Sequence, residues 1–146
     1  MDHKFSIAGI RLSEAHFSIN QGYKREKNKP IEIIHAIEIG YKQNDKVLQV
    51  LVSVSSDAEN QPFRFSVAWE GSFAFEEVPT GEELDRIIHI NCASIIYPYV
   101  RESIADLTRR AGKMPLNLAP FNFVAMYEGK KKESQNAPRK SRKIKQ

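Results

Sequence analysis

The sequence predicts an α+β fold, in which a four-stranded antiparallel sheet carries helices packed on one face. Two patterns support this prediction. Up to residue 79, stretches of alternating apolar and polar residues are separated by short polar segments, as in antiparallel strands with one covered face. From residue 80 onward the apolar residues have helical spacing instead. The 146 residues suffice for a single hydrophobic core, and they contain no internal repeat.

The four predicted strands each place one apolar face toward the core. In the first, Ala15, Phe17 and Ile19 alternate with polar residues, and a polar connection then runs to Pro30. The Asn-Asp pair in the segment QNDK predicts a tight turn between the second and third strands, because both residues tolerate the backbone of such turns. The strands are expected at residues 13–20, 31–41, 47–55 and 63–71.

The opposite face of the sheet also carries apolar residues. Ile34 and Ala36 lie on this face of the second strand, and Val47 and Leu51 on that of the third. A sheet face that is not covered by helices and is this apolar favours burial by self-association.

The helical part is expected to begin after Thr80. This residue can cap a helix while Glu83, three positions later, closes a capping box. We expect the helix to break or kink within residues 91–94, because Pro98 is best tolerated in the first turn of a new helix.

The second predicted helix ends at Gly112, a residue suited to the left-handed conformation that follows a helix. The segment PLNLAP is then a stiff, extended connector, and a last helix starts at about Phe121. The apolar stripe of the second helix consists of Tyr97, Val100, Ile104 and Leu107.

Positive charge is concentrated at the C-terminus. From Lys130 onward there are eight Lys or Arg residues and one acid, a net charge of +7, whereas the first 129 residues have a net charge of −3. We therefore expect a folded domain at 1–128 and a basic, disordered tail at 129–146. The tail can attract nucleic-acid phosphates, but no aromatic residue interleaves its charges to stack on bases, so a solubilising role is favoured.

No catalytic residue, metal or cofactor is predicted. The sequence lacks phosphate-binding glycine loops, zinc-protease motifs and nucleophile elbows. The single cysteine, Cys92, follows His89 by three positions, but its apolar neighbours favour a buried thiol over a nucleophile. Neither a signal peptide nor an apolar run of membrane-spanning length is present, so we expect a cytoplasmic protein.

One segment is far more specific than these patterns. The stretch NCASIIYPYVRESIADLTRRAGKMPLNLAPFNFVAMY resembles the hallmark segment of the SecB family of bacterial export chaperones, and the resemblance extends over about residues 5–128. The matching residues are Pro98, Tyr99, Arg101, Glu102, Gly112, Pro115, Leu116, Asn117, Leu118, Ala119, Pro120, Asn122 and Phe123.

The resemblance implies an ATP-independent holdase that assembles as a dimer of dimers and binds unfolded polypeptide segments in long grooves. Extended clients would meet apolar, adaptable side chains, which gives affinity with little sequence specificity. The expected client-binding residues are Tyr23, Ile31, Ile33, Phe63, Phe65, Phe121, Met126 and Tyr127.

The sequence departs from the family on the face that, in export chaperones, docks the zinc-binding tail of the motor SecA. Glu14 keeps one acid of that face, whereas Ser18 and Ser66 replace two others and Arg64 replaces an apolar contact. These changes should weaken binding to a basic zinc module, which makes SecA a doubtful partner. They favour a chaperone dedicated to one client, such as the antitoxin of a toxin–antitoxin–chaperone system, over the alternative of a general export chaperone that delivers preproteins to SecA.

Overall fold

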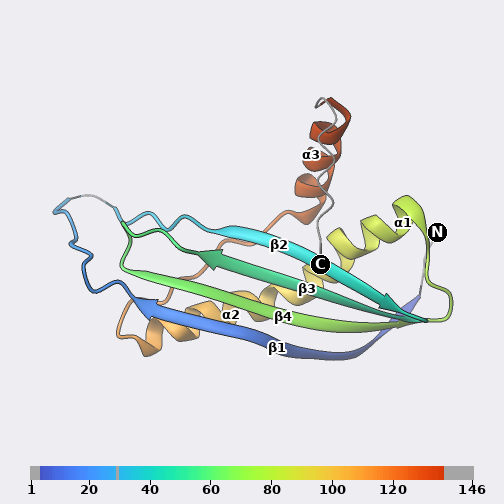
Figure 1. The fold of residues 1–146 in the computed structure, drawn as a ribbon, viewed down its shortest axis with the longest axis horizontal. Helices are drawn as coiled ribbons and strands as arrows, with labels where there is room; N and C mark the ends of the chain where they lie inside the picture. The colour runs from blue at the N-terminus through green and yellow to red at the C-terminus, as the bar shows by residue number, and fades with distance from the viewer. Residues whose placement is uncertain (1–3, 29, 137–146) are drawn as a thin grey trace.

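The computed structural model describes residues 4–28 and 30–136, and it contains a four-stranded antiparallel sheet with the order β1-β4-β3-β2 (Figure 1). The strands are β1 (Phe5–Ile19), β2 (Ala36–Asn44), β3 (Val47–Ser56) and β4 (Phe63–Phe75). Every neighbouring pair is antiparallel. The predicted sheet is confirmed.

Strand β1 begins eight residues before the predicted start at residue 13. Its pairing with β4 shifts register twice, between Ile7 and Gly9 and between Leu12 and Glu14. Each such bulge inserts a residue and reverses which side chains face the core. The alternation is therefore interrupted, and only its last stretch is visible in the sequence.

Strand β2 begins at Ala36 rather than at residue 31. The neighbouring strand β3 ends at Ser56, so the five preceding residues have no strand to pair with. The Ser56 hydroxyl donates a hydrogen bond to the Ile34 carbonyl instead. The chain from 31 to 35 is thus attached to the sheet without being part of it.

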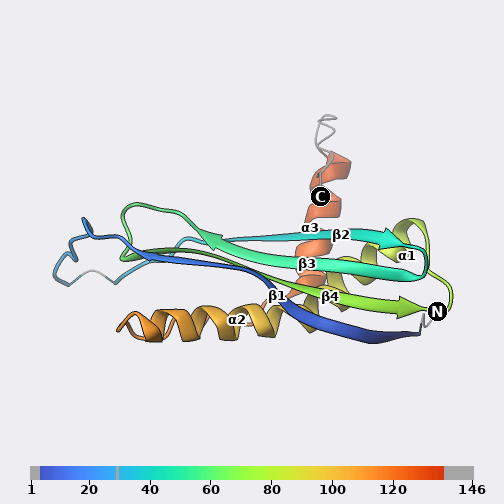
Figure 2. The same ribbon diagram turned by 60° about the horizontal axis from the view of Figure 1, so that its bottom comes forward.

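Helices pack on one face of the sheet, as Figure 2 shows for the long helix α2 (Ala93–Arg110). The residues of β3 alternate strictly, and Leu48, Val50, Val52 and Val54 are completely buried. The predicted inner face of this strand is confirmed. The same core includes Phe63, Phe65, Val67 and Phe73 of β4 and Ile96, Val100 and Ile104 of α2.

We expected a break or a kink within residues 91–94, and no break occurs there. Helix α1 (Gly81–Arg86) passes into a π-helical segment η1 (Ile87–Cys92), and η1 continues directly into α2. Pro98 therefore lies inside α2 and removes a backbone donor there. The carbonyl that loses this donor belongs to Ser94, which is exposed to solvent, so water can satisfy it.

The Thr80 side of the predicted capping box is not formed. Thr80 occupies the N-cap position of α1 with an extended backbone, but its side chain makes no capping hydrogen bond. Gly81 follows with φ of +62°, a conformation that favours glycine. The helix start is therefore set by backbone conformation and by the acids Glu82 and Glu83 in the first turn.

The end of α2 agrees with the prediction, since Gly112 has φ of +75° and its amide bonds the Arg109 carbonyl. The connector beyond it is fixed by two side chains of α2. The Leu116 amide donates to Thr108 Oγ1 at 2.9 Å, and the Tyr97 hydroxyl donates to the Ala119 carbonyl at 2.9 Å.

The last helix, α3 (Phe123–Asn136), projects from the sheet in both ribbon views (Figures 1 and 2). It runs past Gly129, so residues 130–136 are helical and not disordered as predicted. Lys and Glu are good helix formers, so the composition of this segment does not distinguish a helix from a disordered tail. Residues 137–146 lie outside the described part of the chain, and the division at 128 stays a prediction. No helix of the described residues is long and apolar enough to cross a membrane.

Candidate functional site

An open groove of about 670 Å³ lies at the end of the molecule where α2 ends, and we call it the connector groove. Three segments form it: the connection between β1 and β2, the start of β4, and the connector after α2. Its lining residues are Tyr23, Arg25, Ile31, Ile33, Pro62, Phe63, Gly112, Lys113, Met114, Pro115 and Leu116.

The floor of the connector groove is buried, whereas its rim is exposed. Phe63 belongs to the core with 5% of its surface exposed, and Ile33 and Leu116 pack against that core. At the rim, Ile31 is 41% and Met114 is 88% exposed. A flexible methionine beside an anchored apolar floor can adapt to apolar side chains of different shapes.

A second apolar region surrounds the end of the connector. The ring of Tyr97 lies 6.1 Å from that of Phe121 and 5.5 Å from that of Phe123, and the two phenylalanine rings are 5.4 Å apart. Phe123 is buried, whereas Phe121 remains 38% exposed. Phe121 is therefore the accessible edge of a fixed aromatic cluster.

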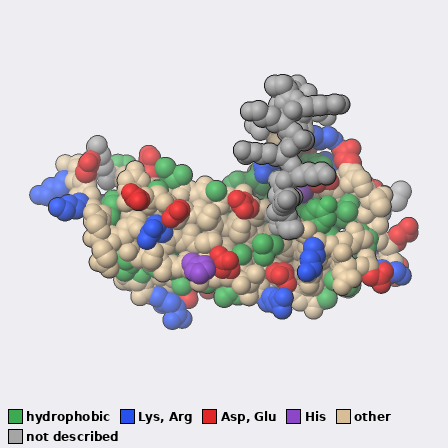
Figure 3. All heavy atoms as spheres, viewed as in Figure 1, with side chains coloured by type: hydrophobic (Ala, Val, Ile, Leu, Met, Phe, Trp, Pro, Cys, Tyr) green, Lys and Arg blue, Asp and Glu red, His purple; other side chains and the backbone are tan. Residues whose placement is uncertain are grey.

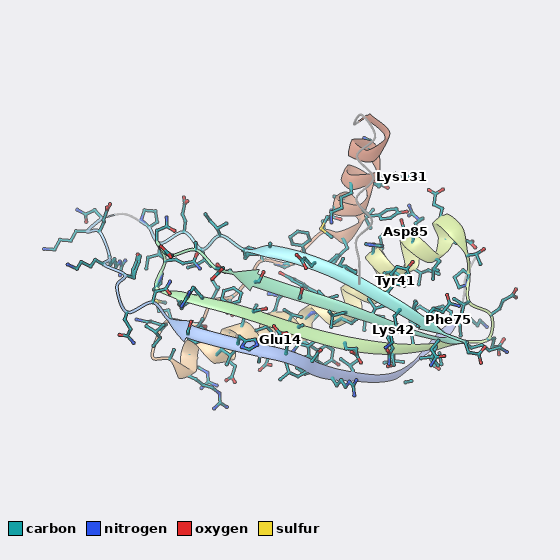
Figure 4. The ribbon with its side chains drawn as sticks, in the orientation of Figure 1. Glu14, Tyr41, Lys42, Phe75, Asp85 and Lys131 are labelled. Atoms are coloured by element: carbon teal, nitrogen blue, oxygen red, sulfur yellow. The ribbon has the colours of Figure 1, made fainter. Side chains whose placement is uncertain are left out.

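A third region lies at the root of α3, where Tyr127 packs on the helices that precede α2. Its ring is 5.9 Å from that of His89, and the Arg86 guanidinium lies over it at 5.6 Å. Burial and a hydrogen bond with Asp85 raise the pKa of Tyr127. Figure 4 shows Asp85, Tyr41 and Lys131 at this place, and Lys131 forms an ion pair with Glu82. This region holds α3 in position.

The eight predicted client-binding residues therefore do not form one surface within the chain. Tyr23, Ile31, Ile33 and Phe63 lie together in the connector groove, and Phe121 lies in the aromatic cluster. The other three have different places. Phe65 is a core residue with 4% exposure, Met126 packs partly against the core, and Tyr127 is buried at the root of α3.

The four predicted docking residues lie side by side on β1 and β4, on the sheet face away from α2. Ser18 pairs with Arg64 across the two strands. The Ser66 hydroxyl donates to Glu14 at 3.1 Å, and Arg64 lies 3.8 Å from the Asp57 carboxylate. Figure 4 labels Glu14 on β1. Glu14, the acid that this face keeps, is thus bonded to Ser66. Arg64, which replaces an apolar contact, lies beside Asp57.

Cys92 has the environment of a structural thiol. It is completely buried, and burial raises its pKa to about 12, whereas a nucleophilic thiol needs a lowered pKa. His89 Nδ1 lies 3.2 Å from the carboxylate of Asp85, one turn earlier in the helix. Among the described residues no three His, Cys, Asp or Glu side chains are grouped to hold a metal ion.

Sequence reasoning missed Arg25, Lys113 and Met114 as groove residues. The basic character of the segment YKREKNK was visible, but the pattern could not show that it folds beside the end of α2. The signal available in the sequence was the position of Met114, an apolar residue that follows Lys113 and the helix-ending Gly112. The structure leaves its side chain exposed.

The fold is that of a SecB-like chaperone. The SecB-like chaperone of Mycobacterium tuberculosis, solved in complex with a ChAD peptide from the HigA1 antitoxin, superposes with a TM-score of 0.68 at 21% identity, covering 80% of this chain and 90% of that one. A protein of unknown function from Streptococcus agalactiae has the same general fold, with a TM-score of 0.52 at 12% identity, covering 82% of this chain and 99% of that one.

Sequence comparison identifies the family. Residues 13–134 match the family model of the preprotein translocase subunit SecB. The protein-export protein SecB of Neisseria meningitidis serogroup B is 30% identical over 132 residues, covering 77% of this chain and 88% of that protein. That of Chromobacterium violaceum is 34% identical over 105 residues, covering 70% and 69%. The chain belongs to the SecB family and is a non-enzymatic chaperone of that family.

Proposed function

We propose that the protein is an ATP-independent holdase that binds unfolded polypeptide segments and serves protein export in the cytoplasm. The curated relatives are protein-export proteins, so they favour general export over the single-client role that the docking face suggested. The observation that carries the proposal is the connector groove, whose apolar floor opens to solvent past Ile31 and Met114.

The physical basis is the burial of client side chains against a surface that is already folded. Burying apolar area contributes about 25 cal/mol per Å² before the cost of ordering the client. The groove floor is fixed by the core, so most of the ordering cost falls on the client. A holdase needs this combination, because binding must be reversible and tolerant of sequence.

Assembly as a dimer of dimers is part of the proposal. Leu12 is 49% exposed and pairs with Trp69, whose ring is 5.1 Å from the half-exposed ring of Tyr99 on α2. Trp69 donates a hydrogen bond to Ser103 of α2, so these residues lie on the helix side of the sheet, and most of the neighbouring strand β1 is exposed. An apolar strip of this kind supports burial against a second copy. On the opposite face, Val47 and Leu51 are already half-buried, whereas Ile34 beside the start of β2 is 66% exposed.

The first test measures client holding without ATP. A denatured model protein is diluted into buffer with the full chain, and its aggregation is followed by light scattering. The expected result is suppression at stoichiometric chaperone concentration, weakened by Ile31→Ser and Met114→Ser together. The matched control is the double variant Tyr41→Ser and Val124→Ser, which changes two exposed residues outside the connector groove. Equal suppression by both variants would place client binding elsewhere.

The second candidate is a chaperone dedicated to one client, an antitoxin. The altered docking face favours it, because Ser18, Arg64 and Ser66 stand where export chaperones are expected to carry acids or an apolar contact. Titration of purified SecA into the chaperone separates the two functions. Binding as tight as that of an export SecB supports general export. Absence of SecA binding, together with one small partner recovered at stoichiometric yield from the native host, supports the dedicated role.

A further inference from the structure

The charged residues that line the connector groove are cations. Among the described residues these are Arg25 and Lys113, and both are exposed. They come from different segments, one before β2 and one directly after α2, and in the described part of the chain neither is paired with a carboxylate. Figure 3 shows Lys and Arg side chains at this end of the molecule, with Asp and Glu side chains beside them.

Acids lie on the other side of Tyr23 and Ile31. These two residues separate the groove from a neighbouring depression of about 550 Å³, which Lys24 and three carboxylates also line. The carboxylates are Glu26, Glu32 and Glu59. A segment bound across the apolar floor therefore meets Arg25 and Lys113 within the groove, and Lys24 and three carboxylates beyond the Tyr23–Ile31 wall.

We propose that the connector groove selects apolar client segments that carry acidic residues next to their apolar centre, where these residues reach Arg25 or Lys113. The inference rests on the proposed function and names the class of client that this groove prefers. The apolar residues supply the affinity, and the two cations set which segments bind. An acidic group that extends past the Tyr23–Ile31 wall instead approaches Glu32 and Glu59.

The chain's own C-terminus does not fit this site. Residues 137–146 carry five cations and no acid, and Ile144 is their only large apolar residue. Such a segment would place positive charge against Arg25 and Lys113. An external segment with an apolar centre and an acidic flank has the complementary charge.

The expected selectivity is moderate, because Arg25 and Lys113 are exposed. Two exposed charge pairs together give about a fivefold preference for an acidic over a basic flank near physiological salt. The preference should shrink as salt rises, since the screening length falls from about 8 Å to about 3 Å between 0.15 M and 1 M ionic strength. The apolar contribution to binding persists at high salt.

The test uses the full chain and three fluorescent, unstructured peptides that share one apolar centre. One carries two aspartates at a single end, one carries two lysines there, and one carries two serines. Fluorescence anisotropy gives each Kd. We expect the aspartate peptide to bind about fivefold more tightly than the lysine peptide, and R25E/K113E to reverse that order. Lys42→Glu together with Lys4→Glu, two exposed lysines outside the groove, matches the change in net charge and should leave the order unchanged.

Each outcome separates the inference from the proposed function. Equal Kd values for the three peptides would overturn the charge selectivity while leaving the holdase intact. A preference for aspartate that survives R25E/K113E would show that cations elsewhere, including those of the C-terminal residues, cause it, which also overturns the inference. Failure of all three peptides to bind would overturn the proposed function itself.

Discussion

The two long helices of this chain are attached to the rest of the molecule in opposite ways. Helix α2 lies along the sheet and buries one side of its whole length, whereas α3 stands away from it and is held near its root (Figures 1 and 2). The buried residues of α2 are Ala93, Ile96, Tyr97, Val100, Ile104 and Thr108, while α3 has buried side chains at Phe123 and Tyr127.

This difference indicates that α2 contributes to the stability of the fold, whereas α3 mainly presents a surface. Burial against β3 and β4 makes α2 part of the cooperative core. Phe123 and Met126 attach the first turn of α3 to the core, and Tyr127 and Lys131 add an aromatic packing, a cation–π contact and an ion pair. Local opening of α3 beyond its first turn should therefore cost less than unfolding the sheet. Substitutions on the two helices should therefore differ in size and in what they disturb.

The largest effect is expected from Ile104→Ala on α2. Ile104 is 1% exposed and packs between α2 and the sheet, so its truncation leaves a cavity. We expect a loss of about 3 kcal/mol in the free energy of unfolding, measured by denaturant titration. Val124→Ala on α3, where the side chain is 43% exposed, is the control and should cost less than about 0.5 kcal/mol. Similar losses at both positions would contradict the division between the helices.

The next effect tests how closely α2 approaches the sheet. A Cβ added at Gly71 would lie 2.8 Å from Phe73 Cε2 and 3.0 Å from Ile96 Cδ1. Both neighbours are completely buried and cannot move freely. Gly71→Ala should therefore cost about 1–3 kcal/mol through overpacking, measured in the same titration. Gly129→Ala on α3 meets nothing within 4 Å and should be neutral or slightly stabilising. A neutral Gly71→Ala would mean that α2 sits further from the sheet.

The same contrast explains which parts of the structure could be predicted. Strands β3 and β4 were visible because one face of each is buried, and burial imposes a period of two on the sequence. The start of β1 was not visible, because the bulges after Ile7 and Leu12 shift that period twice. The π-helical segment was missed because Pro98 suggested a break, while the backbone continues through η1 instead.

The candidate site was predicted only in part, for a related reason. Phe63 and Ile33 could be placed because they are continuous with strand patterns. The alternation of a strand does not show whether an aromatic residue faces the core or a groove, because that depends on tertiary packing. Phe65 was expected in the groove, but within the chain it is a core residue. The charged rim depends on two segments about 90 positions apart, and only the folded chain brings them together.

Thr108 joins the two regions, and its substitution should have an intermediate effect. Its hydroxyl bonds the Ile104 carbonyl at 3.0 Å and accepts the Leu116 amide at 2.9 Å. Thr108→Val keeps the shape but leaves that amide without its acceptor, which should cost about 1–2 kcal/mol. Hydrogen exchange at the Leu116 amide should accelerate, whereas Thr108→Ser, which keeps the hydroxyl, should leave it protected. Unchanged protection in Thr108→Val would mean that packing alone fixes the connector.

The smallest effect is expected at the root of α3, where Tyr127→Phe removes only the hydroxyl that bonds Asp85. The change should cost about 0.5–1 kcal/mol of local stability. Amide exchange within α3 should therefore be faster, with global unfolding nearly unchanged. Tyr99→Phe is the control, because it removes a hydroxyl from a half-exposed ring on α2 and should not alter exchange in α3. Acceleration across the sheet as well would show that α3 is part of the cooperative core.

The pH dependence of this contact follows from the raised pKa of Tyr127, which burial causes first and the hydrogen bond with Asp85 second. Folding favours the neutral phenol, so its contribution to stability is complete below the unfolded pKa of about 10 and is lost as pH rises through the higher folded value. Above that pH, ionisation places a phenolate beside the Asp85 carboxylate, and α3 should open before the sheet unfolds. Phenolate absorbance, with the Tyr127→Phe titration subtracted, measures the pKa. A value at or below the ordinary tyrosine pKa would mean that Tyr127 is solvated and that α3 is held by Phe123 and the Lys131–Glu82 ion pair instead.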